Sequence, residues 1–552
     1  MPDTRVLSAL LLPLPAHRRG LLLYVPSLNG KPSQSLKLRE RLIGDLGTGW
    51  DSEYWPHLVR PWSRGDFPRL VRLMMARISA LTQAAADENR PYTDIILIGH
   101  SMGGILVRDG WLTARADIES AHGETGSDWS LKVRRLILLG APNAGFAPRR
   151  LPLAARIAFF IARPFRRLIV SDLAKGSPYI TDLRIRWVRR FRAGGKLPGV
   201  VQVLGGYDRL VRDEDCIDVL HMPGSVLTRI DQAGHDDLPT VAARDQWYPV
   251  LRRSVMGSFD TRWTGGQSSE TRAVVMLLHG IRSGRYRSWV ADLSADIAAI
   301  PDPPRVATPS YGYLSALGFA LPSVRAAQRR RFLDWYSRLH VDYPPEKISF
   351  AGHSNGTYIL GSALREVPSM QFARIYLAGS VLPRTYPWTD VLSTRGQVLG
   401  PAAGEATGVV HSDRARHDLP VNILCSALRG LGMRDLGTAG FDGFDDDVEG
   451  LVQDAAWFPG GHGSPLEGAH RLKWVASFLS GRCDPCDPGG TPPNAPSHAF
   501  RFAGRLTTRL TAVVALAVLG GALWWLVIGH SLTRLAIVLG IGFLAWAIGA
   551  SL

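Results

Sequence analysis

Short apolar runs along this chain alternate with longer segments in which apolar residues recur with helical spacing. The runs GLLLYV at 20–25 and IILIG at 95–99 have the length and composition of buried strands. Between them, FPRLVRLMMARISALTQAAA at 67–86 has the period of an amphipathic helix. The first part of the chain therefore predicts a strand, a helix and a second strand.

The same order returns some 250 residues further along the chain. The run AVVMLL at 273–278 predicts a strand, VRAAQRRRFLDWYSRLHVD at 324–342 a helix, and ISFAG at 348–352 a second strand. Strands and helices that alternate with short loops form mostly parallel sheets flanked by helices. The sequence thus predicts an α/β fold with two tandem domains of the same architecture.

Shifts in composition mark the ends of these domains. Residues 257–270, GSFDTRWTGGQSSE, lack apolar periodicity and predict a linker. Residues 481–507 begin with a stretch rich in Pro and Gly and predict a tether. The expected organisation is an N-terminal domain at 1–256, a second domain at 271–480 and a membrane segment at 508–552.

Two apolar runs in the last segment, 511–529 and 535–552, are long enough to cross a bilayer. The turn between them is short, so they predict a transmembrane helical hairpin. The turn offers Arg534 alone, whereas three arginines precede the first run: Arg501, Arg505 and Arg509. By the positive-inside rule, we expect the two large domains on the cytoplasmic side of the inner or cell membrane.

Composition narrows the classes of partner. The chain has 552 residues, of which 46% are hydrophobic and 20% charged, and its formal net charge is +16. A basic excess favours anionic partners. Because no zinc-finger, homeodomain or RNA-binding signature accompanies the charge, a membrane surface ranks above nucleic acid, and we expect no nucleic-acid partner.

The cysteines indicate neither a disulfide framework nor a metal centre. The chain has 4 cysteines, too few for a disulfide-stapled fold. Cys483 and Cys486 form a C-x-x-C pair in linker-like sequence, but a zinc site would need two further ligands, and no obvious pair occurs. We expect no metal and no cofactor.

The chain carries the pattern G-x-S-x-G twice, as GHSMGG at 99–104 and GHSNGT at 352–357. Each copy follows a predicted strand and precedes a predicted helix. A sharp strand-to-helix turn places the serine at the carboxyl edge of the sheet, where the helix N-terminus can stabilise an oxyanion. Ser101 and Ser354 are therefore the candidate nucleophiles.

A serine nucleophile needs a base and an acid that orients the base. After Ser101, the strand VVQVLGG ends just before Asp208, and His235 follows in the loop AGHDDLP. This order, nucleophile, acid and then histidine, predicts a first triad. Three other carboxylates near the strand end compete for the role of the acid: Asp213, Asp215 and Asp218.

The second copy leaves more alternatives. Asp413 and Asp418 both follow Ser354, and we choose Asp418 because a valine follows it at the same spacing as Val211 follows Asp208. For the base we choose His462, in the Gly-rich loop WFPGGHGSPL. Three other histidines are weaker candidates: His411, His417 and His470.

Backbone N–H groups after each serine and after each early strand are the candidate oxyanion donors. In the first domain they belong to Leu28 and Met102, and in the second to Ile281 and Asn355. Pro and Ser replace His-Gly in the loop of the first domain, but a backbone donor does not depend on those side chains.

Both halves resemble the α/β-hydrolase superfamily, over most of residues 20–475. The first half resembles its lipase branch, which includes the GPI inositol-deacylase-like enzymes. The motifs that carry this likeness are GHSMGG, LILLGAPNAGF, LAKGSPYITDL, GGYDRLV and GHDDL. The lipase pattern more often has His where Asn143 stands. The second half is similar only through HGI, GHSNG, DLPV and GGHG. The resemblance implies acyl-enzyme chemistry on an ester or a related acyl bond, but no particular substrate.

Residues 147–170 bear on the substrate, because they interleave apolar residues with arginine. Such a segment could lie as a cap on an anionic bilayer, or pack over the pocket as an ordinary lid. Together with the basic charge, it favours a lipid or another membrane-borne ester as substrate.

The leading hypothesis is a membrane-anchored serine esterase with two catalytic domains. One alternative is that one domain, with the second as the stronger candidate, is a binding or scaffold module. Another is that the protein is an acyltransferase or thioesterase.

Overall fold

A computed structural model describes residues 19–528 of the protein. The segments outside this description are 29, 58, 60–65, 121–128, 151–168, 216–224, 258–271, 282–288, 313, 401–408, 454–456 and 484–494. The chain divides into two compact units, Met1–Ser269 (unit 1) and Glu270–Leu552 (unit 2). Most of the predicted linker and most of the predicted cap lie outside the described residues.

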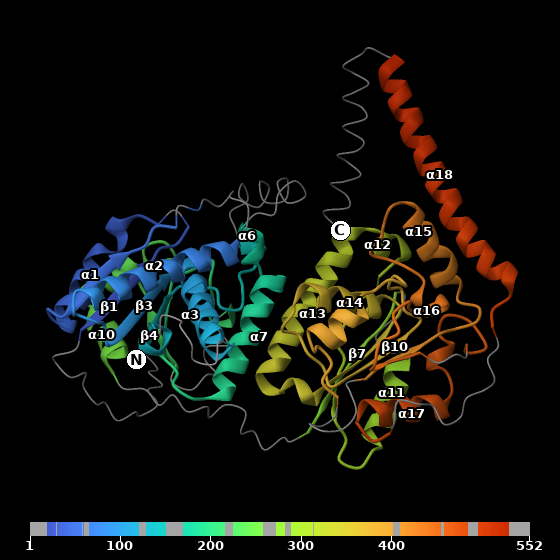
Figure 1. Ribbon diagram of the computed structural model, residues 1–552, viewed down its shortest axis with the longest axis horizontal. Coiled ribbons are helices and arrows are strands. Elements are labelled where there is room, and N and C mark those ends of the chain that lie inside the picture. Colours follow the sequence, from blue (N-terminus) through green and yellow to red (C-terminus); the bar gives the residue numbers. More distant parts are fainter. Residues whose placement is uncertain are drawn as a thin grey trace. The chain divides into compact units, whose positions relative to one another are not determined.

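Within the described residues, the sheet of unit 1 has six strands in the order β2-β1-β3-β4-β5-β6, and every neighbouring pair is parallel (Figure 1). The strands are β1 (Gly20–Val25), β2 (Trp50–Tyr54), β3 (Asp94–His100), β4 (Val133–Leu139), β5 (Gly199–Gly205) and β6 (Ser225–Ile230). Strands β1, β3 and β5 are buried along their whole length, as their continuous apolar sequences predict.

Helices and short 3₁₀ turns connect these strands. They are α1 (Pro32–Leu46), α2 (Phe67–Asp87), α3 (Met102–Ser120), α4 (Trp129–Lys132), η1 (Pro148–Arg150), α6 (Ile169–Asp172), α7 (Pro178–Ala193), η2 (Asp213–Asp215), α9 (Leu238–Ala242) and α10 (Tyr248–Met256). Helix α2 begins where the carboxylate of Asp66 accepts the N–H of Arg69. Side chains of α1, α9 and α10 share one core with alternate residues of β1, β3, β4 and β5, so these helices cover one face of the sheet.

The described part of unit 2 also has a six-stranded parallel sheet, in the order β12-β11-β10-β9-β7-β8. Its strands are β7 (Val274–Leu278), β8 (Arg305–Ala307), β9 (Ile348–His353), β10 (Arg374–Ala378), β11 (Val409–Asp413) and β12 (Leu451–Gln453). Starting from the opposite edge, the order is β8-β7-β9-β10-β11-β12, which matches the order in unit 1 strand for strand. Strand β7 corresponds to β1, and β9 corresponds to β3. The predicted duplication of architecture is therefore confirmed.

The helices of unit 2 differ more from those of unit 1. They are α11 (Trp289–Ala298), α12 (Ala316–Ala320), α13 (Pro322–Asp342), α14 (Asn355–Glu366), α15 (Ser426–Gly430), α16 (Ala439–Asp442), α17 (Ala469–Leu479) and α18 (His498–Ile528). Short 3₁₀ or π turns are η3 (Pro345–Lys347), η4 (Asp390–Thr394), η5 (Pro420–Cys425) and η6 (Ser464–Leu466). Side chains of α11 and α17 form one core with the buried residues of β7, β9 and β10.

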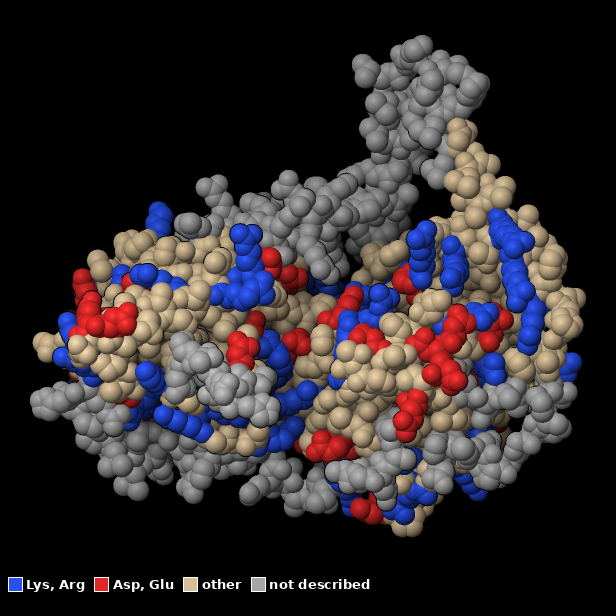
Figure 2. All heavy atoms as spheres, in the orientation of Figure 1, with Lys and Arg blue, Asp and Glu red and all other residues tan. Residues whose placement is uncertain are grey.

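Helix α18 contains most of the first predicted membrane span. The basic side chains that Figure 2 shows along the lower part of α18 are arginines, and the described residues after Arg509 include no charged side chain. Among the described side chains of α18, six large apolar ones are more than half exposed: Phe502, Leu510, Val513, Val514, Leu516 and Val518. Among the helices that the structure describes, none has the length and the hydropathy that a membrane crossing requires. The predicted transmembrane hairpin is therefore not confirmed, and its second span, 535–552, lies outside the described residues.

Candidate active site

The first serine lies at a strained turn between strand β3 and helix α3. Ser101 has φ of 52°, in the left-handed region that non-glycine residues rarely adopt. The turn needs the neighbouring glycines, because a Cβ on Gly99 would lie 2.4 Å from the backbone of Gly103. A Cβ on Gly103 would lie 2.2 Å from the carbonyl oxygen of Val25, at the end of β1. The strand, the turn and the helix are therefore packed backbone against backbone around Ser101.

Ser101, His235 and Asp208 form a continuous hydrogen-bonded row. Nδ1 of His235 lies 2.7 Å from Oδ2 of Asp208, whose side chain is fully buried. Because a carboxylate accepts, Nδ1 carries the proton of the neutral ring and Nε2 is the acceptor. Nε2 lies 2.8 Å from Oγ of Ser101, so the hydroxyl donates its proton toward the imidazole. This is the arrangement in which a histidine can remove the proton from a serine hydroxyl.

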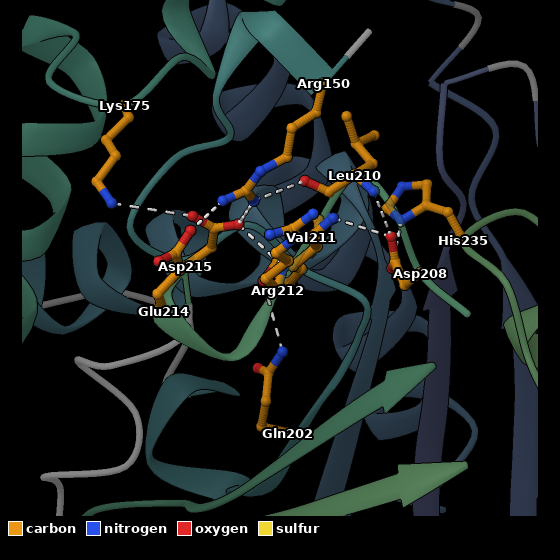
Figure 3. Close-up of polar contacts among 11 residues, drawn as sticks. Arg150, Lys175, Gln202, Asp208, Leu210, Val211, Arg212, Glu214, Asp215 and His235 are labelled. Carbon is orange, nitrogen blue, oxygen red and sulfur yellow. Dashed lines mark hydrogen bonds and ion pairs between the residues drawn. The ribbon is translucent and has the colours of Figure 1, made fainter. Parts of the chain in front are cut away.

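A tight turn after β5 holds the acid (Figure 3). The N–H groups of Leu210 and Val211 both donate to Oδ1 of Asp208, each at 2.9 Å. Arg150 reaches this turn from η1 and donates from Nη1 to the carbonyl oxygen of Leu210 at 3.3 Å. The acid therefore uses one oxygen for the imidazole and the other for its own turn.

The competing carboxylates of unit 1 have other environments. Asp215 is fully buried, forms an ion pair with Arg150 and accepts the N–H of Arg212 at 2.9 Å. Burial, the largest cause, raises the pKa of Asp215 above its ordinary value although Arg150 lowers it. Asp218 lies outside the described residues, as does the side chain of Asp213. Asp208 is the carboxylate that the structure brings to His235.

His100, the residue before the nucleophile, supports the base. It is 2% exposed, and its Nε2 lies 2.8 Å from the carbonyl oxygen of His235. A carbonyl only accepts, so the Nε2–H of His100 donates. Burial, followed by the charge of His235, lowers the pKa of His100 to about 4. A neutral His100 thus holds the backbone of His235, a contact that sequence reasoning missed although a histidine stands in both G-H-S motifs.

The two predicted oxyanion donors of unit 1 lie on adjoining segments. Met102 is the first residue of α3, so its N–H has no acceptor within the helix. Leu28 lies in the loop after β1, whose Pro26 carbonyl also faces Gly103. That carbonyl accepts a hydrogen bond from Nε2 of the buried His57 at 3.1 Å. His57, which sequence reasoning also missed, therefore helps to fix the loop that carries Leu28.

The second serine lies at a turn of the same kind. Ser354 has φ of 54° and sits between β9 and α14. Nδ1 of His462 lies 2.8 Å from Oδ2 of Asp418, and the N–H of Val421 donates to Oδ1 of Asp418 at 2.9 Å. Nε2 of His353 donates to the carbonyl oxygen of His462 at 3.1 Å, as His100 does to His235. The structure thus brings together the predicted acid and base of unit 2.

Two details separate this second site from the first. Nε2 of His462 is buried and has no hydrogen-bond partner among the described residues, whereas Nε2 of His235 is bonded to Ser101. Ser354 is only 4% exposed, whereas Ser101 is half-buried. The second site therefore has its elbow and its His–Asp pair, but not the serine–histidine hydrogen bond.

The oxyanion loop of unit 2 is also close to its serine. A Cβ on Gly280 would lie 2.7 Å from Cβ of Ser354, so the loop that contains Gly280 and Ile281 lies directly against the turn of Ser354. Asn355, the other predicted donor, is buried at the start of α14. The carbonyl of His279 accepts from the hydroxyl of Tyr311 at 2.5 Å, the counterpart of the His57 contact in unit 1.

The alternative acid Asp413 belongs to a buried network on strand β11. Its carboxylate accepts from the hydroxyl of Tyr376 at 2.5 Å and lies 2.8 Å from Nε2 of His411. Nε of Arg471 donates to it as well, at 3.1 Å. Burial raises the pKa of Asp413, but His411 and Arg471 outweigh it and lower the value to about 2. Asp413 and His411 thus bind each other, and the exposed His417 and His470 lie outside the His462–Asp418 pair.

Asn143, which stands where the lipase pattern more often has His, is fully buried. Its Oδ1 accepts from Arg108 at 2.7 Å and its Nδ2 donates to Gln202 at 2.8 Å. The amide therefore connects α3 with β5 by donating and accepting at once. Among the described residues, no group of His, Cys, Asp and Glu has the arrangement of a metal site, and Cys486 lies outside them.

Comparisons with known proteins give similar folds at low similarity. No family model and no curated protein matches the sequence. A monoacylglycerol lipase of Paleococcus ferrophilus is similar with TM-score 0.26 and 15% identity, covering 43% of this chain and 92% of that one. The phospholipase PlaB of Legionella pneumophila is similar with TM-score 0.24 and 16% identity, covering 34% of this chain and 39% of that one. A monoglyceride lipase of Saccharomyces cerevisiae is similar with TM-score 0.29 and 12% identity, covering 46% of this chain and 95% of that one. Scores this low carry no argument about activity.

The fold follows from the chain itself. Both units have a parallel sheet, a strained serine between its third strand and the next helix, and a His–Asp pair at the carboxyl edge. These are the features by which the sequence resembles the α/β-hydrolase superfamily, and the structure has them in both halves.

Proposed function

We propose that the protein is a membrane-associated serine hydrolase that cleaves an ester of a lipid or of another membrane-borne acyl compound. The observation that carries this proposal is the row from Ser101 through His235 to the buried Asp208, with contacts of 2.8 and 2.7 Å. A serine hydroxyl bonded to a neutral, oriented imidazole is the requirement for nucleophilic attack at neutral pH.

The geometry supports a two-step acyl transfer. Oγ of Ser101 attacks the ester carbonyl carbon while Nε2 of His235 takes the hydroxyl proton, and the carbonyl oxygen becomes an oxyanion. The N–H groups of Met102 and Leu28 are the proposed donors to that oxygen. When the tetrahedral species collapses, the alcohol leaves with the proton of the imidazolium, and Asp208 stabilises that cation. Water then attacks the acyl-serine by the same route, which releases the acid and restores Ser101.

The membrane component of the proposal rests on helix α18. Most of its exposed large apolar side chains lie at 510–518, directly after the exposed Arg505 and Arg509. A basic segment followed by an apolar one suits the boundary between anionic headgroups and acyl chains. The basic segment precedes the apolar one in the chain, so we place both units on the cytoplasmic side of the inner or cell membrane.

A specific observation favours a second role for unit 2. Because Nε2 of His462 has no hydrogen-bond partner among the described residues and Ser354 is 4% exposed, unit 2 could bind an acyl compound or a partner without turning it over. If both units are active, Ser354 reacts as a nucleophile. If unit 2 is a binding unit, Ser354 does not react, and this is the single difference between the two proposals.

Ester hydrolysis by single-serine variants tests the proposed activity. The substrates are p-nitrophenyl butyrate in solution and a monoacylglycerol in phosphatidylglycerol vesicles. In a Ser354→Ala background, which removes the second serine, we expect Ser101→Ala to lower turnover by at least about 10³-fold, the loss expected when a nucleophile is removed. The matched control is Ser254→Ala, whose hydroxyl bonds Thr228 on β6 away from the site. Full activity in Ser101→Ala would contradict the proposal, and activity on the soluble ester alone would contradict its lipid component.

A further inference from the structure

The first part of helix α18 packs against the turn that carries Asp418. In η5, the backbone N–H of Asn422 donates to the carbonyl oxygen of Asp418 at 2.9 Å. The side chain of Asn422, which is 2% exposed, donates from Nδ2 to the carbonyl oxygen of Phe500 on α18 at 2.7 Å. One buried residue therefore connects the acid of the second site with the C-terminal helix.

Glycines allow this helix to approach closely at two points. A Cβ on Gly504 of α18 would lie 2.0 Å from Oδ1 of Asn422. At the other point, a Cβ on Gly430 at the end of α15 would lie 1.9 Å from Oγ1 of Thr511. Any side chain at either position would push α18 away from η5 and α15. The two glycines are therefore required for α18 to pack at this distance.

The contacts of α18 also extend toward the loop that carries His462. The ring of Phe500 lies 6.2 Å from that of His417, the residue before Asp418. The N–H of His417 in turn donates to the carbonyl oxygen of Gly460, two residues before His462, at 2.8 Å. Helix α18 therefore packs on the segment of Asp418 directly and is connected to the loop of His462 through His417.

Unit 1 holds its acid turn by a different means. There Arg150 donates to Leu210 in the turn of Asp208 and forms an ion pair with Asp215 (Figure 3). In unit 2 the segment that packs on the acid turn is α18, whose continuation exposes apolar side chains such as Val514 and Leu516. The second acid turn is thus supported by the helix that we propose to associate with lipid.

We propose that α18 is a positioning element of the second catalytic site, and that Asn422 and Gly504 act as positioning residues by docking it on the Asp418 turn. With α18 docked, Asp418 stays within hydrogen-bond distance of His462. Displacement of α18 loosens the turn and lowers the reactivity of Ser354. The inference rests on the proposed function, because it requires unit 2 to be a serine hydrolase.

Labelling of Ser354 by a fluorophosphonate tests this coupling in the full-length chain. Ser101→Ala removes the first nucleophile, so that the remaining label reports Ser354. On this background, we expect Gly504→Leu to slow labelling at least about tenfold, because His462 loses the carboxylate of Asp418 that orients its ring. Labelling of Ser101 in the Ser354→Ala chain should not change with the same substitution. Asn422→Ala, which removes one hydrogen bond, is the milder variant if Gly504→Leu does not fold. Leu506→Ala, on a side chain of α18 that is 39% exposed, is the matched control and leaves the labelling rate unchanged.

The possible outcomes separate the inference from the proposed function. Equal or faster labelling in both Gly504→Leu and Asn422→Ala overturns the positioning role of α18. Slower labelling of Ser354 overturns it too if the same substitution slows labelling of Ser101 equally in the Ser354→Ala chain, since a general loss of structure would affect both serines. If Ser354 never reacts while α18 is intact, the inference fails, but labelling of Ser101 in the Ser354→Ala chain still upholds the proposed function for unit 1.

Discussion

Nε2 of His100 donates to the backbone carbonyl oxygen of His235 at 2.8 Å, so the residue before Ser101 holds the histidine that is hydrogen-bonded to Ser101. His353 makes the same contact with His462 at 3.1 Å. The two units agree in this detail although their histidine loops, AGHDDLP and PGGHGSPL, have little sequence in common. The histidine of each G-H-S turn thus holds the backbone of the histidine in the His–Asp pair of its unit.

We expect His100→Ala to lower kcat of the first site roughly 10- to 100-fold with little change in KM, because the base loses its position rather than its substrate. His100→Gln restores a donor and should recover part of the loss. Steady-state kinetics on p-nitrophenyl butyrate in a Ser354→Ala background measure both constants. The control is His353→Ala in the same background, which alters the other unit. Equal kcat in His100→Ala and the control would refute the positioning role.

Burial of His100 also predicts how the stability of unit 1 depends on pH. Burial lowers the pKa of His100 to about 4, whereas an unfolded histidine titrates near its ordinary value of 6.5. Between these values the unfolded chain binds a proton that the folded chain excludes. The stability therefore falls as the pH drops from about 6.5 to about 4, by up to roughly 3 kcal/mol.

Thermal unfolding between pH 4 and pH 7 measures this dependence. His100→Gln, which cannot titrate, should lose less stability over this interval than the unmodified chain. Parallel stability curves for the two proteins would show that His100 does not carry the effect.

The close packing at the elbow predicts a strong effect of one methyl group. Gly103→Ala places a Cβ about 2.2 Å from the carbonyl oxygen of Val25 and should separate the oxyanion loop from helix α3. We expect a loss of activity of at least about 100-fold, the scale for a misplaced oxyanion donor. The control is Gly44→Ala in α1, where no atom lies within 4 Å of the new Cβ. That substitution should stabilise unit 1 by about 0.5–1 kcal/mol, as measured by thermal unfolding. An active Gly103→Ala enzyme would contradict the packing argument.

Arg150 offers a test of how the first acid turn is held. Arg150→Gln removes the nearer ion-pair partner of the fully buried Asp215 and leaves Lys175 at 4.0 Å, so we expect a cost of about 2 kcal/mol, less than for a buried carboxylate with no partner. We expect that loss in urea unfolding, accompanied by a lower kcat because the turn of Asp208 loosens. The control is Arg77→Gln, which breaks the more exposed pair with Glu53 and should cost less than about 1 kcal/mol. Similar losses for the two variants would contradict the structural role of Arg150.

The sheets and the serines could be predicted because their signals are local. Continuous apolar runs such as IILIG predict buried parallel strands, and glycines around Ser101 and Ser354 indicate the strained turn in which the structure places both serines. Asp208 could be chosen because it follows β5 directly. The acid of the second site was harder to choose from the sequence. The sequence does not show that the carboxylate of Asp413 accepts hydrogen bonds from Tyr376 and Arg471.

The supporting contacts could not be predicted in the same way. His57 and Tyr311 bind backbone carbonyls, and any residue can supply a carbonyl, so no side-chain pattern marks the partner. The contact of Asn422 with Phe500 joins residues 78 positions apart and depends on how α18 folds back on unit 2. Only the histidine repeated in both G-H-S motifs was a usable signal.

The central claim is that the Ser101 elbow holds an activated nucleophile. Fluorophosphonate labelling of four full-length proteins in detergent tests it: the unmodified chain, Ser101→Ala, Ser354→Ala and the double variant. We predict that Ser101→Ala loses most of the label, that Ser354→Ala keeps it, and that the double variant shows none. Label that remains only in Ser101→Ala would assign the activity to unit 2 instead. Label that persists in the double variant would contradict the assignment of both nucleophiles.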